Sequence, residues 1–135
     1  MFIKIIYRDP PELSSNRVEV EDSEEKVLLV NPKCLVRIML EYIRSRCNLG
    51  LYTWFDLCDE SGAVMGLFDM PSYKYPTEKF KNGGTYYVIV IKQEKTEQIF
   101  PQVNHSNPLY AELKERVRRF LDGRNSATSI SELKT

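Results

Sequence analysis

The sequence predicts an α+β domain in which one helix crosses a mixed β-sheet. The strongest strand signal runs over 85–92, where seven consecutive β-branched or aromatic residues follow an Asn-Gly-Gly turn. Both faces of this segment are apolar, which is typical of a strand in the middle of a sheet with cover on each side. A second strand signal at 2–8 and a helix that opens with Asn31-Pro32 complete the prediction.

Composition places the chain among ordinary globular domains. Its 135 residues are 42% hydrophobic and 28% charged, and 19 basic and 19 acidic side chains give no net charge. We expect no nucleic-acid partner, because such binders carry a basic excess or a basic face. We expect no membrane partner, because no apolar run reaches the roughly 18 residues of a membrane span.

The N-terminal segment and the cysteines favour an intracellular, cytoplasmic protein. Residues 1–7 alternate like a strand and lack the charged start and cleavage site of a signal peptide. Cys34, Cys47 and Cys58 are an odd number without C-x-x-C spacing. This pattern favours a reducing compartment.

The first hairpin is predicted from two strands and an acidic connection. Asp9-Pro10-Pro11 ends the strand at 2–8, because proline cannot donate to a sheet ladder. Residues 9–25 are crowded with Asp and Glu and are expected to form an acidic insertion in the hairpin. The second strand is predicted at 26–30.

A helix is predicted from about Pro32 to Cys47. Asn31 is the expected N-cap, and the stretch Asn48-Leu49-Gly50 supplies the stop. The polar residues of this helix fall on one narrow stripe, whereas a surface helix shows a wider polar face. The helix is therefore either covered on more than one side or has an exposed hydrophobic flank.

The second half of the sheet follows. A strand is predicted at 54–58, a turn at 59–62, a weak fourth strand at 63–68 and a long aromatic connection at 69–84 before the strand at 85–92. A linker is expected at 93–106, an amphipathic helix at 107–123 that ends at Gly123, and a disordered tail at 124–135.

This order describes a β-grasp over 1–92 with an added C-terminal amphipathic helix. The elements are a hairpin, a crossing helix and a last strand that returns beside the first. Only a few topologies can connect them, because crossovers between parallel strands are right-handed. The first and last strands are therefore expected to be parallel neighbours.

The order of elements resembles ubiquitin, and the region 29–92 resembles the chromosome X open-reading-frame sixty-five-like family of ubiquitin-like proteins. The similar stretches are Met1-Phe2-Ile3-Lys4, Val30-Asn31-Pro32-Lys33-Cys34, Asp56-Leu57-Cys58-Asp59-Glu60-Ser61-Gly62 and Thr85-Tyr86-Tyr87-Val88. The resemblance implies a ubiquitin-like fold and a setting in motile cilia, and it implies no catalytic residues. A shorter stretch, 80–86, is similar to doublecortin domains, which bind microtubules.

No group of side chains predicts catalysis, a metal site or a cofactor site. A cysteine nucleophile needs a base, and the chain offers only His105, in a polar linker. The acidic insertion lacks the ligand spacing and the central glycine of a calcium loop. We therefore expect a protein that is not an enzyme, holds no cofactor and has no small-molecule substrate.

The outer face of the sheet is the first candidate partner-binding surface. If Ile3, Ile5, Val88 and Val90 face the core, alternation turns five other apolar side chains outward. These five are Phe2, Ile6, Tyr87, Ile89 and Ile91. An apolar patch of this size usually marks an interaction site.

The apolar stripe of the helix at 107–123 is the second candidate. Its partner-binding residues are Leu109, Leu113, Val117 and Phe120. Two interpretations remain open: the stripe folds back over the outer face of the sheet, or it lies in the groove of a partner protein.

Two classes of function follow. The first is a non-catalytic structural or scaffold subunit of a microtubule-associated assembly in the cytoskeleton, such as the axoneme of a cilium or flagellum. The second is a ubiquitin-like signalling adaptor in which Lys4 of one copy meets the acidic hairpin of another, namely Asp56, Asp59 and Glu60. Such head-to-tail pairing would form chains.

Overall fold

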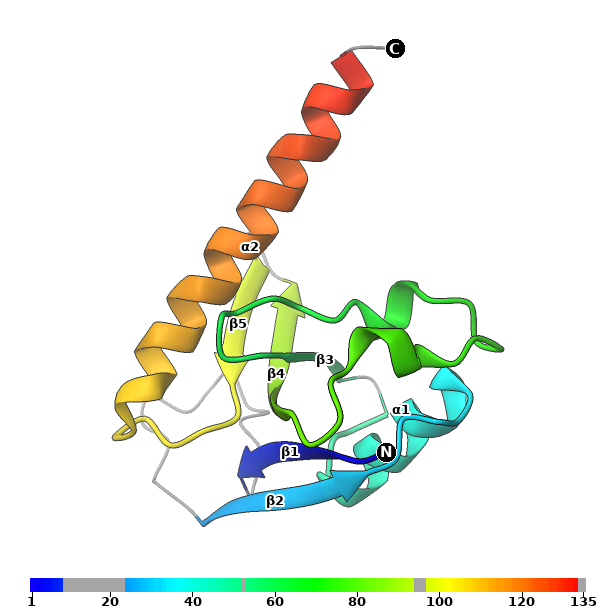
Figure 1. The fold of residues 1–135 in the computed structure, drawn as a ribbon. Coiled ribbons are helices and arrows are strands. Elements are labelled where there is room, and N and C mark those ends of the chain that lie inside the picture. Colours follow the sequence, from blue (N-terminus) through cyan, green and yellow to red (C-terminus); the bar gives the residue numbers. More distant parts are fainter. Residues whose placement is uncertain (9–23, 52, 94–96, 134–135) are drawn as a thin grey trace.

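A mixed sheet of five strands organises the fold (Figure 1). The computed structural model describes residues 1–8, 24–51, 53–93 and 97–133, so most of the predicted acidic insertion lies outside the described residues. The strands are β1 (Ile3–Arg8), β2 (Glu25–Val30), β3 (Trp54–Cys58), β4 (Thr85–Gln93) and β5 (Glu97–Pro101). They lie in the order β2-β1-β4-β3, and β5 pairs with β4. The predicted α+β class is confirmed.

β4 is the central strand, as its two apolar faces predict. It runs parallel to β1, with Lys4 opposite Thr85 and Ile6 opposite Tyr87, which confirms the predicted parallel pairing. β3 pairs antiparallel along its other edge. Because β1 reaches only the first part of β4, the rest of that edge is left for β5.

The inner core lies between the sheet and α1 (Val36–Arg46). Alternation along β1 and β4 points one set of side chains to this side. Its members from the strands include Ile3, Ile5, Leu28, Val30, Phe55, Leu57, Tyr86, Val88 and Val90, and its members from α1 are Val36, Met39 and Ile43. The predicted inward parity of β1 and β4 is confirmed.

α1 begins four residues later than predicted. The Asn31 side chain accepts a hydrogen bond from the Lys33 amide at 2.9 Å, which closes a local turn instead of capping a helix. The Val36 amide donates instead to the Lys74 carbonyl at 2.8 Å. A carbonyl of a neighbouring loop therefore accepts the hydrogen bond of the first helical amide.

The predicted stop of α1 is confirmed. Asn48 adopts a left-handed conformation with φ of 56°. The Leu49 amide donates to the Arg44 carbonyl at 2.9 Å, and the Asn48 amide donates to the Ser45 carbonyl at 3.4 Å. These two bonds form a Schellman motif, in which asparagine takes the position that glycine commonly holds.

The outer core lies between the other face of the sheet and α2 (Pro108–Leu133). Its buried residues are Cys58, Tyr87, Ile89, Ile99, Val103, Leu113 and Val117. The predicted start of α2 is confirmed, because the Asn107 side chain accepts a hydrogen bond from the Leu109 amide at 3.0 Å. Figure 1 shows that α2 runs alongside β5 and that its C-terminal part extends beyond the sheet.

The prediction of a linker at 93–106 is wrong, because the segment contains β5. Ile89 of β4 lies opposite Pro101, and Ile91 lies opposite Ile99. Unpaired amide and carbonyl groups on the remaining edge of β4 would be costly once α2 covers the sheet. The returning chain satisfies them even though its sequence has a weak strand pattern.

The predictions of a strand at 63–68 and of a disordered tail are also wrong. Gly66 has a left-handed φ of 68°, so the first segment makes one bridge between Cys58 and Val64 and then a short 3-10 helix, η1 (Leu67–Asp69). The helix α2 passes through Gly123 and ends at Leu133. Glycine costs about 1 kcal/mol in a helix interior but does not forbid the helix.

Candidate interaction surface

α2 covers most of the outer sheet face that the sequence offered as a partner surface. Tyr87 and Ile89 are 5% and 0% exposed, and Leu113 and Val117 of α2 are fully buried against them. Ile6, Ile91 and Leu109 pack at the margin of the same cluster. Of the two open interpretations, the structure has the helix folded back on its own sheet.

The assignment of Tyr87, Ile89, Leu113 and Val117 to partner binding is therefore corrected. A fully buried side chain cannot contact a partner unless the helix leaves the sheet. Phe2 and Phe120 are the two members of the predicted set that stay exposed, at 48% and 37%.

The turn at 59–62 fixes the position of α2. The Asp59 carboxylate accepts hydrogen bonds from the Ser61 and Ala63 amides, which shapes the turn. Gly62 has a φ of 85°, and a Cβ at this position would lie 2.4 Å from the Cβ of Arg116. The Arg116 guanidinium donates to the Glu60 carbonyl at 2.8 Å. Backbone contact between turn and helix therefore requires glycine here.

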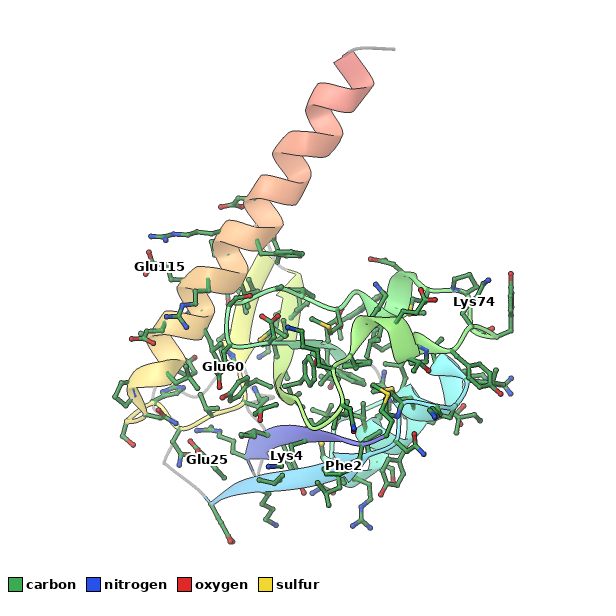
Figure 2. All side chains as sticks on the ribbon, in the orientation of Figure 1. Phe2, Lys4, Glu25, Glu60, Lys74 and Glu115 are labelled. Carbon is green, nitrogen blue, oxygen red and sulfur yellow. The ribbon has the colours of Figure 1, made fainter. Side chains whose placement is uncertain are left out.

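The predicted pairing of Lys4 with an acidic hairpin meets a structural obstacle. Asp56 is only 7% exposed and accepts hydrogen bonds from the Leu57 and Leu67 amides. Asp59 is bound within its own turn. Lys4 and Glu60 are exposed, and Figure 2 shows Lys4 on β1 and Glu60 beside α2. Asp56 is therefore not available to a lysine of another copy.

Burial governs the chemistry of Asp56. Desolvation raises the pKa of its carboxyl to about 6, and the hydrogen bonds that it accepts from backbone amides oppose part of the rise. The carboxyl thus serves as an acceptor that holds η1 against β3. This role was not predictable from the sequence, because strand alternation alone could place Asp56 on either side of the sheet.

Two charged residues, Arg8 of β1 and Glu25 of β2, lie at one end of the hairpin that these strands form. Arg8 is 1% exposed, and its guanidinium has no hydrogen-bond partner among the described residues. Its cross-strand neighbour is Glu25. Glu25 accepts hydrogen bonds from the Asn104 amide at 3.0 Å and the Asn107 side chain at 3.1 Å, so it links β2 to the start of α2 (Figure 2).

The three thiols are free and poorly activated. Cys47 and Cys58 are buried, and Cys34 is half-buried. Desolvation raises the pKa of all three, that of Cys47 to about 12. A thiol with a raised pKa carries little thiolate at neutral pH and is a weak nucleophile. His105 lies against the Tyr110 ring, with ring centroids 4.3 Å apart.

Within the described ranges, no three His, Cys, Asp or Glu side chains lie closely enough to share a metal ion. In the same part of the chain, no helix combines the length and the apolar character needed to cross a membrane.

An apolar groove runs between α1 and the segment at 67–72, and its volume is about 270 Å³. Its lining residues are Val36, Arg37, Leu40, Glu41, Arg44, Leu67, Phe68, Met70 and Ser72. The sequence did not single out this groove. The narrow polar stripe of the helix was the signal for it, since α1 has the exposed hydrophobic flank that this stripe allowed.

Several large apolar side chains on α1, at 51–54 and at 73–75 are exposed. Ile38 and Tyr42 on α1 are 45% and 43% exposed, and Trp54 is 61% exposed. The Trp54 ring lies 5.9 Å from that of Phe68 on the groove wall. Further members of this surface are Leu51, Tyr73 and Tyr75. We call this set, together with the groove, the α1 surface.

A family model described as "Putative Interleukin 2 receptor, gamma chain" (Il2rg) matches residues 23–117. The chain belongs to this Il2rg family. The Il2rg match runs from the start of β2 into α2, so it includes the α1 surface and the buried part of the outer core. β1 lies before the Il2rg region, and Phe120 lies after it. No solved structure matches the chain.

Proposed function

We propose that this protein is a non-catalytic structural or scaffold subunit of a microtubule-associated assembly, in the axoneme of a cilium or flagellum. The proposed cellular setting rests on the sequence resemblance to the chromosome X open-reading-frame sixty-five-like family. Subunits of large assemblies bind through exposed apolar side chains and need no catalytic group. The poorly activated thiols agree with such a role.

The α1 surface is the observation that carries the proposal. Leu51, Trp54 and Tyr73 are 82%, 61% and 69% exposed, and aromatic side chains are enriched at the centres of protein interfaces. The outward side of the first hairpin adds Val27 and Leu29, each 59% exposed. These side chains replace the α2-covered face as the partner-binding residues.

A β-grasp is the finer fold that we assign to the domain. Three features support it: β1 and β4 are parallel neighbours, β2 and β3 lie outside them, and α1 packs on one face of the sheet. In this assignment β5 and α2 are additions: β5 extends the sheet, and α2 covers the face that ubiquitin keeps open.

Fractionation of motile cilia tests the function. A tagged chain expressed at its native level is expected to stay with the detergent-insoluble axoneme and to cross-link to microtubule-associated proteins through the α1 surface. A Trp54→Ser, Tyr73→Ser variant should shift to the soluble fraction, whereas Lys114→Ser on α2 should not. Wild-type protein found wholly in the detergent-soluble fraction, with cross-links only within itself, would overturn the proposal.

A further inference from the structure

We propose that the α1 groove binds an acidic, amphipathic segment of a partner protein. This inference rests on the proposed scaffold role and names the chemistry of the partner. Three properties of the groove support it: its shape, the charge of the residues that line it, and the hydrogen bonds that hold its walls in place.

The groove fits the side chains of a bound segment. Its floor is formed by Val36 and Leu67, which are 1% and 0% exposed, and its walls are Leu40, Phe68 and Met70. The volume of about 270 Å³ falls just below the roughly 300–1,000 Å³ of small-molecule sites. An amphipathic segment that inserts one or two large apolar residues makes better use of such a groove than a whole cofactor does.

The walls of the groove are held in place without a partner. Backbone hydrogen bonds join the Val36 amide to the Lys74 carbonyl and the Arg37 amide to the Ser72 carbonyl. Arg44 donates to the Gly50 and Thr53 carbonyls, and its guanidinium lies 5.1 Å from the centre of the Phe55 ring. A groove that is already formed costs a ligand little conformational entropy.

The charge around the groove predicts the charge of the segment that binds there. The charged residues that line the groove are Arg37, Glu41 and Arg44, two basic against one acidic, and Lys74 follows the lining segment in the chain. Arg37 lines the groove and is exposed, and its guanidinium forms no ion pair or hydrogen bond within the described ranges. Figure 2 places Lys74 at the same end of the molecule as α1. A carboxylate one helical turn from the inserted apolar residue would meet Arg37.

Selection from a displayed library of short random peptides tests the proposal on the purified full chain. Selected binders are expected to combine Asp or Glu with large apolar residues and to weaken as salt is raised. Arg37→Glu should weaken them by about tenfold or more, because a rim attraction becomes a repulsion. Arg37→Lys should keep most of the affinity, and Arg119→Glu on α2 is the matched charge control.

Ser72→Trp tests the groove itself, because Ser72 is an exposed lining residue and the large side chain would fill the space. It should abolish binding while Ser72→Ala leaves it unchanged. The inference is overturned if selection gives no binder, if binders are basic or uncharged, or if Ser72→Trp does not affect them. It is also overturned if the purified chain self-associates and Ser72→Trp alone abolishes this, since the occupant is then a second copy. None of these results depends on cilia, so they leave the axonemal proposal to its own test.

Discussion

At the scale of the residue, Asp56 makes stability depend on pH. Its carboxyl has a pKa of about 6 in the fold against an ordinary 3.8, so the folded chain holds this proton more tightly than the unfolded chain. Its contribution to stability is full below about pH 4 and is lost as pH rises through about 6. A shift of this size corresponds to about 3 kcal/mol.

Asp56→Asn is therefore expected to raise the free energy of unfolding at neutral pH relative to wild type, since its amide oxygen can still accept from Leu67. Denaturant titrations of both proteins at several pH values provide the measurement. The difference between them should shrink as pH falls from about 6 to about 4. A difference that does not change with pH would show that folding does not raise the pKa of Asp56.

Gly62 gives a second prediction at this scale. Alanine would place a Cβ against the backbone of α2 at Arg116 and Val117, in addition to the strain of a positive φ. We expect Gly62→Ala to lower the melting temperature by about 8 °C or more. Gly83→Ala is the matched control, because Gly83 has a φ of 74° and open space around it. It should cost about 4 °C, and equal losses would argue against a tight contact between turn and helix.

At the scale of the element, α2 behaves as part of the core. Leu113→Asp or Val117→Asp would bury a carboxylate without a partner, which costs several kcal/mol. Each variant is expected to lower the melting temperature by more than about 10 °C, as followed by circular dichroism. Ala111→Asp on the exposed side of α2 should leave it nearly unchanged. An unaltered melt in the buried variants would mean that α2 does not pack on the sheet in solution.

The elements also show what local sequence could and could not predict. The central strand, the start of α2 and the stop of α1 were predictable because their signals are local: two apolar faces, an Asn-Pro pair and an Asn-Leu-Gly stretch. β5 was missed because its pairing is determined by the free edge of β4, which is a tertiary fact. The start of α1 was misplaced for the same reason, since Lys74 satisfies its amide from a distant loop.

The candidate interaction surface was likewise predictable only in the part that local sequence determines. The alternation of β1 and β4 correctly separated two sets of apolar side chains, but it could not say what covers the outer one. The α1 groove needs the segment at 67–72, whose turn at Gly66 replaces a predicted strand. Only the narrow polar stripe of α1 was visible in the sequence.

At the scale of the whole molecule, one strand serves two cores. Val88 and Val90 of β4 belong to the inner core, whereas Tyr87 and Ile89 belong to the outer one. A chain ending at Gln93 would keep the first core and lose the cover of the second. We expect this truncated chain to bind a hydrophobic dye and to sediment as aggregates, unlike the full chain. A monodisperse truncated monomer would show that the outer core is dispensable.

The position of α2 after β4 in the sequence has a consequence during protein synthesis. The ribosome makes the apolar outer face of β4 before it makes the helix that covers it. At roughly 5–20 residues per second, the wait from β4 to the middle of α2 lasts a few seconds. For that time each nascent chain presents an uncovered apolar strand, which is the kind of segment that molecular chaperones bind.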